Sequence, residues 1–328
     1  MALVGVSLDA GRILPPDTGF DATSFVLQLA STGVVITACA VVLSRGLRGG
    51  IERISRFVLP VLLVILLVLI VRGVTLPGAG AGIDWYILKF DASALTGSVM
   101  LAALGQAIFS LSLGGTYMVI YGSYLSEEES IPSGAAWTAA GDATAGLLAG
   151  FAIFPAVFAL GLEPAGGPGL LFTTLPAVFA GMPAGALFGL LFFVGLASAA
   201  WLSDIAAFEV LIAGLTDNTR VSRRGAILGC SIAVFLLAIP SMISNAIFVP
   251  WDLVFGSGMQ TIGALLAVLT VGWALRRSEV LRQIGGGAGE GAPGLKLRLL
   301  YLWIRYVIPI AILLVGVWWL LTDVLHLR

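Results

Sequence analysis

One membrane-length apolar run of this chain contains the stretch Gln106-Ala107-Ile108-Phe109-Ser110-Leu111-Ser112-Leu113-Gly114-Gly115-Thr116. Two adjacent glycines are poor helix formers, and hydrocarbon cannot solvate the hydroxyl groups of the two serines. Irregular backbone at bilayer depth persists only where protein or a water-filled cavity surrounds it, so a glycine-interrupted span points to a binding site. The alternative is a small-residue packing face between two helices. We favour a helix that is broken in the middle of the membrane.

The composition of the chain is that of an integral membrane protein. Of its 328 residues, 59% are hydrophobic and 11% are charged, and the mean hydropathy is +1.05. A soluble domain carries about a quarter charged residues. The single histidine is His326, and the chain has no phosphate-binding loop and no hydrolase motif. We therefore predict that the protein is not an enzyme and binds no nucleic acid.

Eight apolar runs are long enough to cross a bilayer as helices. They cover residues 24–43, 54–74, 95–124 with the break, 135–160, 183–215, 226–248, 253–275 and 299–322. The apolar residues 166–182 are too few to span and predict a helical loop over one face. The expected fold is an all-α membrane protein with one transmembrane domain over residues 24–322, between tails at residues 1–23 and 323–328.

The distribution of lysine and arginine predicts the orientation of the spans. Twelve of the 17 basic residues lie in the loops between spans one and two, five and six, and seven and eight. These loops share one side, which the positive-inside rule makes cytoplasmic. Arg305 falls inside the eighth span. The chain is thus predicted to be a multi-pass protein of the plasma (inner) membrane, with both termini on the extracytoplasmic side.

An N-terminus outside the cell raises a question about how the chain is inserted. Residues 1–23 contain no apolar core that could act as a signal peptide. A polytopic chain that begins outside usually does so because earlier helices place it there. The sequence therefore predicts the later part of a longer transporter, truncated or started late.

Further motifs accompany the broken span. They are Gly50-Ile51-Glu52-Arg53 leading to Leu59-Pro60, Thr75-Leu76-Pro77-Gly78, Tyr121-Gly122-Ser123-Tyr124, Leu171-Phe172-Thr173-Thr174-Leu175-Pro176, and Phe192-Phe193 through Glu209. With these motifs, residues 24–322 resemble the neurotransmitter:sodium symporter family, in its bacterial amino-acid transporter branch. The resemblance implies that the eight spans correspond to helices 4–11 of the family's inverted-repeat fold, and that the first three helices are absent.

The resemblance assigns roles to the broken span. It implies a substrate pocket that includes Phe109, Ser112, Gly114 and Gly115, with Phe109 as an aromatic gate. It makes Ser110 a sodium ligand and places Gln106 on the outer approach. The family usually has glycine at the position of Thr116 and often a bulky residue at that of Gly115, so the pocket differs in shape. Helix dipoles at a break favour a cation at one end and an anion at the other, which suits a zwitterion beside sodium.

Further candidate sodium ligands lie in the fourth and fifth spans. Asp142 follows Gly141, where the family has an asparagine ligand, and it either replaces that ligand or lies in water near the cytoplasmic end. Ala199 and Ser203 fall at a second sodium site. The family needs a hydroxyl at the position of Leu202, which cannot bind sodium. The adjacent Asp204 either restores a cation site, takes up a proton, or is structural.

Three further positions are implied to act in gating. Gly50 and Pro60 have the spacing with which the family lets the cytoplasmic end of this helix unwind, and both residues weaken a helix. Asp252 lies at the expected outer start of the seventh span, near the family's extracellular gate aspartate. The alignment places that aspartate nearer to Gly256.

The function that these residues predict is sodium-coupled symport of an amino acid by alternating access, with chloride left open as a second ion. A competing hypothesis is a non-transporting membrane subunit or remnant that needs a partner to supply three helices. An intramembrane aspartyl protease built on Asp142 and Asp204 is disfavoured, because the expected G-x-G-D type motif is absent.

The expected absence of three helices leads to a first test. Liposomes that contain only the 328-residue chain should take up no more labelled amino acid under a sodium gradient than empty liposomes. Half of the implied site would be missing, and substrate would not be held. Uptake at a rate set by the sodium gradient would contradict this prediction.

Overall fold

The computed structural model describes residues 2–3, 6–7, 15–89, 91–115, 117–126, 129–164, 169–285 and 294–324. Contacts group the chain into two compact units. Unit 1 comprises residues 1–90 and 145–249, and unit 2 comprises residues 91–144 and 250–328. Helix α6 (Ile131–Ala159) begins in unit 2 and ends in unit 1, and α10 (Asn245–Trp251) crosses the other boundary.

In the described part of the chain, seven helices are long and apolar enough to cross a membrane. They run over Ala22–Ser44, Gly49–Val74, Ile131–Ala159, Gly185–Asn218, Arg223–Met242, Asn245–Ala274 and Leu295–Thr322. The remaining predicted span is divided into α4 (Gly97–Ser110) and α5 (Tyr117–Ser123). The predicted all-α fold class with one broken helix is confirmed. The two-residue strands β1 (Ala2–Leu3) and β2 (Val6–Ser7) form an antiparallel pair before the first span.

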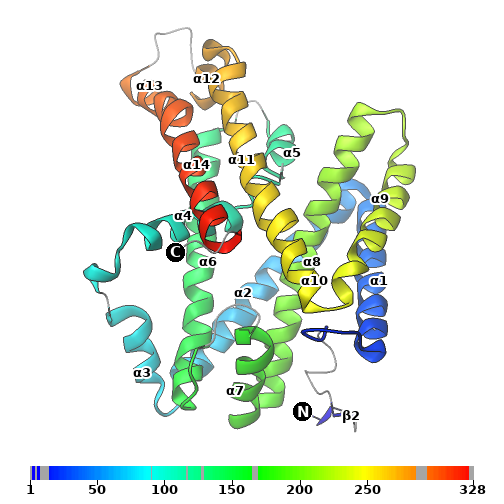
Figure 1. Ribbon diagram of the computed structural model, residues 1–328, viewed down its shortest axis with the longest axis vertical. Helices are drawn as coiled ribbons and strands as arrows, with labels where there is room; N and C mark the ends of the chain where they lie inside the picture. Colours follow the sequence, from blue (N-terminus) through cyan, green and yellow to red (C-terminus); the bar gives the residue numbers. More distant parts are fainter. Residues whose placement is uncertain are drawn as a thin grey trace. The chain divides into compact units, whose positions relative to one another are not determined.

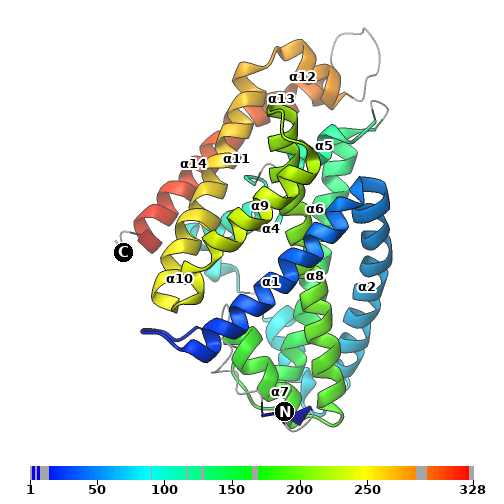
Figure 2. The same cartoon turned by 90° about the vertical axis from the view of Figure 1, so that its right-hand side faces the viewer.

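One core of unit 1 is formed by α1 (Ala22–Ser44), α8 (Gly185–Asn218) and α9 (Arg223–Ala238), which lie side by side (Figure 2). Asp21 caps α1 by accepting hydrogen bonds from the backbone N–H groups of Thr23 and Ser24. The core consists of aliphatic and aromatic side chains, among them Ile36, Leu43, Ile205, Phe208 and Ile212.

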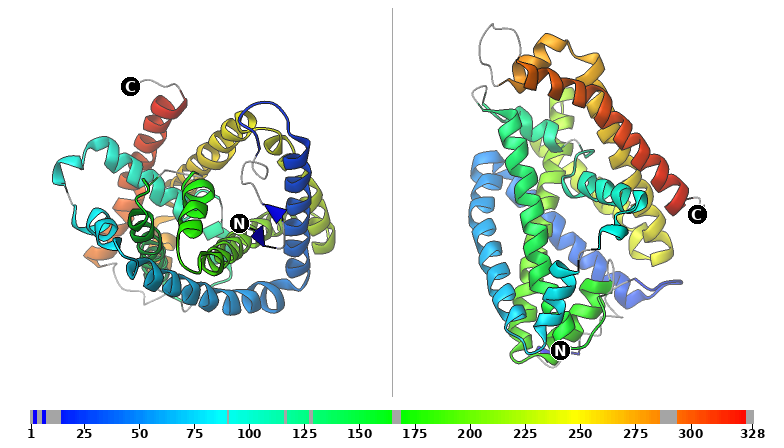
Figure 3. Two further views of the ribbon diagram at one scale, coloured as in Figure 1. Left: turned by 90° about the horizontal axis from the view of Figure 1, so that it is seen from below. Right: turned by 90° about the vertical axis from the view of Figure 1, so that its left-hand side faces the viewer.

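A second core of unit 1 contains Leu76 and Ala79, which follow α2 (Arg53–Val74), together with the end of α6, α7 (Leu175–Gly181) and α8. Helix α2 itself packs along α8 (Figure 3). The π-helical segment η5 (Leu170–Thr174) leads directly into α7, so the predicted loop over residues 166–182 is helical where it is described. After α2 the chain turns at Gly78, whose φ of +90° suits glycine, into α3 (Ala79–Ile83) and η3 (Asp84–Leu88).

Two predicted boundaries are wrong. The loop before the second span is short, because η2 (Leu47–Glu52) continues into α2. The turn between the sixth and seventh spans was predicted at residues 249–252, but α10 already begins at Asn245. The 3-10 turn η6 (Pro240–Met242) ends the preceding helix, since proline lacks the N–H that would continue it. Asp252 therefore lies inside a helix and not at its start.

Unit 2 is built around α11 (Met259–Leu269) and α14 (Ile308–Trp319), with α4 packed on both (Figure 1). Its buried core consists of Ile108, Ala264, Ile312 and Val315. Its other elements are η4 (Ala92–Ala94), η7 (Asp252–Gly258), η8 (Thr270–Ala274), α12 (Arg277–Ile284), α13 (Leu295–Leu302), η9 (Trp303–Val307) and η10 (Leu320–Val324). The packing of α11, α14 and α4 on one another holds the end of α4 at a fixed place in the unit.

A buried ion pair joins three helices of unit 1. Glu209 of α8 is 1% exposed, and both of its carboxylate oxygens accept hydrogen bonds from Arg223, at 3.1 and 2.7 Å. Arg223, the first residue of α9, also donates to the Leu43 carbonyl at the end of α1, at 3.3 Å. This geometry agrees with the structural role that the sequence suggests for Glu209.

Neutralising this pair should destabilise unit 1. Glu209→Gln leaves the Arg223 charge without its carboxylate, so we expect a loss of about 3 kcal/mol in the free energy of unfolding in detergent. The matched control is Glu279→Gln, which breaks the exposed Glu279–Arg282 pair and should cost less than about 1 kcal/mol. Equal stability of the two variants would show that the buried pair does not hold the three helices together.

Candidate functional site

Helix α4 ends in a defined capping motif. The Leu113 N–H donates to the Ile108 carbonyl at 3.1 Å, and the Ser112 N–H donates to the Phe109 carbonyl at 3.0 Å. Ser112 adopts a φ of +51°, in the left-handed region. This is the Schellman arrangement, with serine where glycine is usual. The helix ends at Ser110, four residues before the glycine pair that predicted the break, and α5 starts at Tyr117. Thr116 lies outside the described residues.

The carbonyl groups at the break are only partly free. Besides the capping bonds, the Gln260 side-chain amide donates to the carbonyls of Ile108 and Phe109, at 3.3 Å each. In the described chain, the carbonyls of Ser110 and Leu111 accept no backbone hydrogen bond. The sequence predicts the opening at the glycine pair, whereas these two carbonyls lie earlier, at the last turn of α4.

Close backbone packing explains the first glycine of the pair. A Cβ atom on Gly114 would overlap the Gln260 carbonyl oxygen and lie 2.9 Å from the Ala264 nitrogen. In turn, a Cβ atom on Gly263 would lie 3.3 Å from the Gly114 Cα atom. The break thus contacts the backbone of α11 directly. Both sequence interpretations hold here, because the helix is interrupted and small residues also pack at the interruption.

A hydroxyl and a carboxylate meet at the end of α4. The Ser110 Oγ atom lies 2.7 and 2.8 Å from the two carboxylate oxygens of Asp142, on α6. This contact brings together two of the predicted sodium ligands from different helices. Gly141 has no side chain that could bind an ion, and the oxygen atoms beside Ser110 come from Asp142. The negative end of the α4 dipole adds to the attraction for a cation.

The second set of predicted sodium ligands lies on one turn of α8, in unit 1. The Ser203 Oγ atom donates to the Ala199 carbonyl at 3.3 Å, and Leu202 is half-buried beside it. Asp204 is exposed, and no hydrogen bond to it exists within the described residues. A hydroxyl, a carbonyl and a carboxylate therefore share this turn, but no structural contact joins Asp204 to the other two.

The predicted gating residues Gly50 and Pro60 lie in consecutive helical segments, η2 and α2. Gly50 is buried in the π-helical segment η2, where a Cβ atom would overlap the Val42 carbonyl at the end of α1. Pro60 lies inside α2, where it removes one backbone hydrogen bond. The helix is continuous through both residues, from η2 into α2.

Three predicted residues share a cavity of about 340 Å³ in unit 2, namely Gln106, Phe109 and Asp252. The rest of its lining comes mainly from α4, α11 and α14, and it includes Gln260, Trp318 and Trp319. A volume of this size holds a small ligand. The Asp252 Oδ1 atom would lie 2.6 Å from a Cβ atom on Gly256. The carboxylate therefore fills the space above Gly256, the position that the alignment favours for the gate.

Sequence reasoning missed Gln260, Trp318 and Trp319. Gln260 is a lone amide in an apolar span, a signal that points to a buried polar contact. Two adjacent tryptophans at the end of a span instead suggest an interfacial aromatic belt. Their place beside Phe109 could not be read from the sequence.

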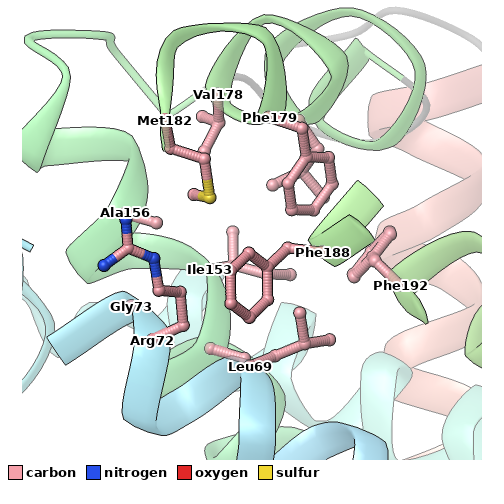
Figure 4. A pocket seen from close by; sticks show the side chains of 12 residues that line it. Leu69, Arg72, Gly73, Ile153, Ala156, Val178, Phe179, Met182, Phe188 and Phe192 are labelled. Carbon is pink, nitrogen blue, oxygen red and sulfur yellow. The ribbon is translucent and has the colours of Figure 1, made fainter. Parts of the chain in front are cut away.

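Two cavities of unit 1 do not fit a zwitterion. One is a narrow space of about 10 Å³, room for a single water molecule, with Arg72 at its edge beside Ala156 (Figure 4). Its guanidinium lies 5.5 Å from the centre of the Phe188 ring and donates to the Pro183 carbonyl at 3.4 Å. The other is an apolar groove of about 730 Å³ along α1, with Arg45 at one end.

Comparison with known proteins identifies the chain's relatives. The model of the sodium:neurotransmitter symporter family matches residues 24–320. The sodium-dependent transporter YhdH of Bacillus subtilis is 34% identical over 88% of the chain and 66% of its own length. A sodium-dependent transporter of Haemophilus influenzae is 33% identical over 84% of the chain and 62% of its own length. The chain thus spans less than two thirds of these two relatives.

A solved structure has the same fold. MhsT, crystallised in complex with L-phenylalanine, superimposes with a TM-score of 0.79 at 33% identity, over 94% of this chain and 70% of that one. This likeness supports the predicted symporter fold.

The contact between the break and α11 gives a direct test. Gly114→Ala should cost about 3 kcal/mol or more in unfolding free energy, because the new methyl group meets backbone atoms that cannot rotate away. Gly122→Ala, in α5 of the same span, meets nothing within 4 Å and should be neutral or stabilising by up to about 1 kcal/mol. Thermal unfolding in detergent measures both, and a tolerated Gly114→Ala would contradict the packing described here.

Proposed function

The chain belongs to the sodium:neurotransmitter symporter family, and we propose that it carries out sodium-coupled transport of an amino acid across the membrane. The family match confirms the resemblance inferred from the motifs. A family of symporters also agrees with the prediction that the chain is not an enzyme. The relatives are longer than this chain, so the proposal concerns the complete transporter fold to which these residues contribute.

The observation that carries the proposal is the interrupted helix with Ser110 and Asp142 at its end. The carboxylate and hydroxyl oxygens are hard ligands that suit a sodium ion, as are the carbonyls of Ser110 and Leu111, which accept no backbone hydrogen bond from the described residues. When sodium binds, the Ser110 hydroxyl turns its proton away from Asp142 and offers a lone pair to the ion. The charge of Asp142 then balances the charge of sodium in a poorly solvating environment.

A second sodium ion is proposed at the α8 turn of unit 1. The Ala199 carbonyl and the Ser203 hydroxyl would be ligands, and Asp204 would replace the hydroxyl that Leu202 lacks. No role for chloride is proposed.

An amino-acid substrate is supported by the chemistry of the unit 2 cavity and by the ligand of MhsT. Phe109, Trp318 and Trp319 give the cavity apolar walls, and Gln106, Gln260 and Asp252 give it polar groups. The ligand in the MhsT complex, L-phenylalanine, is itself an amino acid with an apolar side chain. We propose that Phe109, Ser112, Gly114 and Gly115 contact the substrate, and that Gln106 and Asp252 control its outer approach. Gly50 and Pro60 would act in opening the cytoplasmic side.

The test measures sodium binding to the purified 328-residue chain by competition with radioactive sodium in detergent. Asp142→Asn should weaken binding at least about tenfold, because it removes about 1.4 kcal/mol or more of attraction. Ser110→Ala should weaken it less. A chain extended with the first three helices of YhdH should then transport labelled L-phenylalanine in liposomes only with an inward sodium gradient.

The control variant is Ser123→Ala. Ser123 lies in α5 of the same broken span, where its hydroxyl only donates to the Ile120 carbonyl, so sodium binding should be unchanged. If Asp142→Asn and Ser123→Ala bind sodium alike, the site at the end of α4 is not a sodium site.

A further inference from the structure

A cluster of arginine and aromatic side chains lies where the seventh and eighth spans meet in unit 2. The Arg305 guanidinium stacks on the Trp273 ring, 4.4 Å from its centre, and donates to the Tyr301 hydroxyl at 3.0 Å. The Tyr301 hydroxyl donates in turn to the Gly272 carbonyl at 3.2 Å. The Arg277 guanidinium lies 5.4 Å from the centre of the Tyr301 ring. We refer to Trp273, Arg277, Tyr301 and Arg305 as the arginine–aromatic cluster.

The positive charge of this region is not balanced by carboxylates of the described chain. Arg276, Arg277, Lys296, Arg298 and Arg305 form no ion pair there, whereas Arg282 pairs with Glu279. The Arg305 Nε atom is buried without a hydrogen-bond partner. A guanidinium that stacks by its face keeps the N–H groups of its edge available, and that edge matches the oxygen atoms of a phosphate.

The chemistry of the cluster is typical of a membrane surface. Trp273 is in the last turn of η8, and its contacts place Arg305, which lies inside the eighth span as predicted, beside the end of the seventh span. Trp273 and Trp303 are 55% and 57% exposed, and Tyr306 contacts Trp273. Exposed tryptophan and tyrosine mark the headgroup level of a bilayer. The basic loops predict that this surface is the cytoplasmic one.

We propose that the arginine–aromatic cluster binds the phosphodiester headgroup of an anionic phospholipid. The edge of Arg305 and the guanidinium of Arg277 hold the phosphate oxygens, and the exposed Arg276, Lys296 and Arg298 attract the headgroup. The exposed Leu299 and Leu302 on the neighbouring turns are available to the acyl chains. A phospholipid fits better than a soluble anion, because the basic side chains lie next to exposed leucines, and only a lipid has both a phosphate and acyl chains.

The experiment measures the unfolding temperature of the full chain in detergent with added lipid. Phosphatidylglycerol should raise it in a saturable way, and phosphatidylcholine with the same acyl chains should not. Arg305→Gln and Arg277→Gln should each raise the half-saturating concentration of phosphatidylglycerol about fivefold, the effect of one basic residue near a headgroup. Arg305→Lys keeps the positive charge but lacks the forked guanidinium edge. Its half-saturating concentration of phosphatidylglycerol should therefore lie between those of wild type and Arg305→Gln.

The matched control is Arg282→Gln on the same short helix α12, whose charge is already paired with Glu279, so the lipid response should be retained. If the Arg305→Gln variant does not fold, the Arg277→Gln variant provides the test, because Arg277 is exposed. Equal stabilisation by both lipids, or a wild-type response of the Arg277→Gln variant, would overturn the proposal. Soluble glycerol phosphate that reproduces the full effect would also overturn it, since the site would then take a free phosphate.

Discussion

The structure depends on ending a helix in the middle of an apolar span. Each backbone carbonyl left without a partner in hydrocarbon costs several kcal/mol, so a break needs substitutes for the lost helical bonds. At the end of α4 these substitutes are the N–H groups of Ser112 and Leu113 and the amide of Gln260. The carbonyls of Ser110 and Leu111 remain, and they lie next to the hydroxyl that contacts Asp142. The same constraint therefore produces both the capped end of the helix and the oxygen atoms that we propose as sodium ligands.

Two kinds of residue maintain this arrangement. Gly114 and Gly263 let the backbone of the break touch the backbone of α11, which brings Gln260 within reach of the exposed carbonyls. Ser112 accepts a left-handed conformation that costs about 1–2 kcal/mol for a residue with a side chain. Packing and binding are thus not competing explanations of the glycine pair. The close packing is what holds the interrupted helix open at Ser110 and Leu111.

Much of the fold could be predicted from the sequence, because spans are set by hydrophobic length and the break by two glycines. Pro240 shows where local reasoning failed. The chain contains prolines at 240 and 250, and only the tertiary structure shows which of them ends a helix. The site was predictable in part. Ser110 and Asp142 were identified separately. They are 32 residues apart along the chain, and their contact depends on how α4 packs against α6. Gln260, Trp318 and Trp319 were missed for the same reason.

The central claim is that the end of α4 is an open helix terminus that binds sodium through Ser110 and Asp142. It can be tested with crystals of the chain grown in a sodium salt and in the corresponding choline salt. We expect α4 to end at Ser110 in both structures. In sodium alone, added density should lie roughly 2.4 Å from the Ser110 hydroxyl and from an Asp142 oxygen, the distance typical of hard cations. A continuous helix from Gly97 to Ser123, or the absence of density beside Asp142 in sodium, would contradict it.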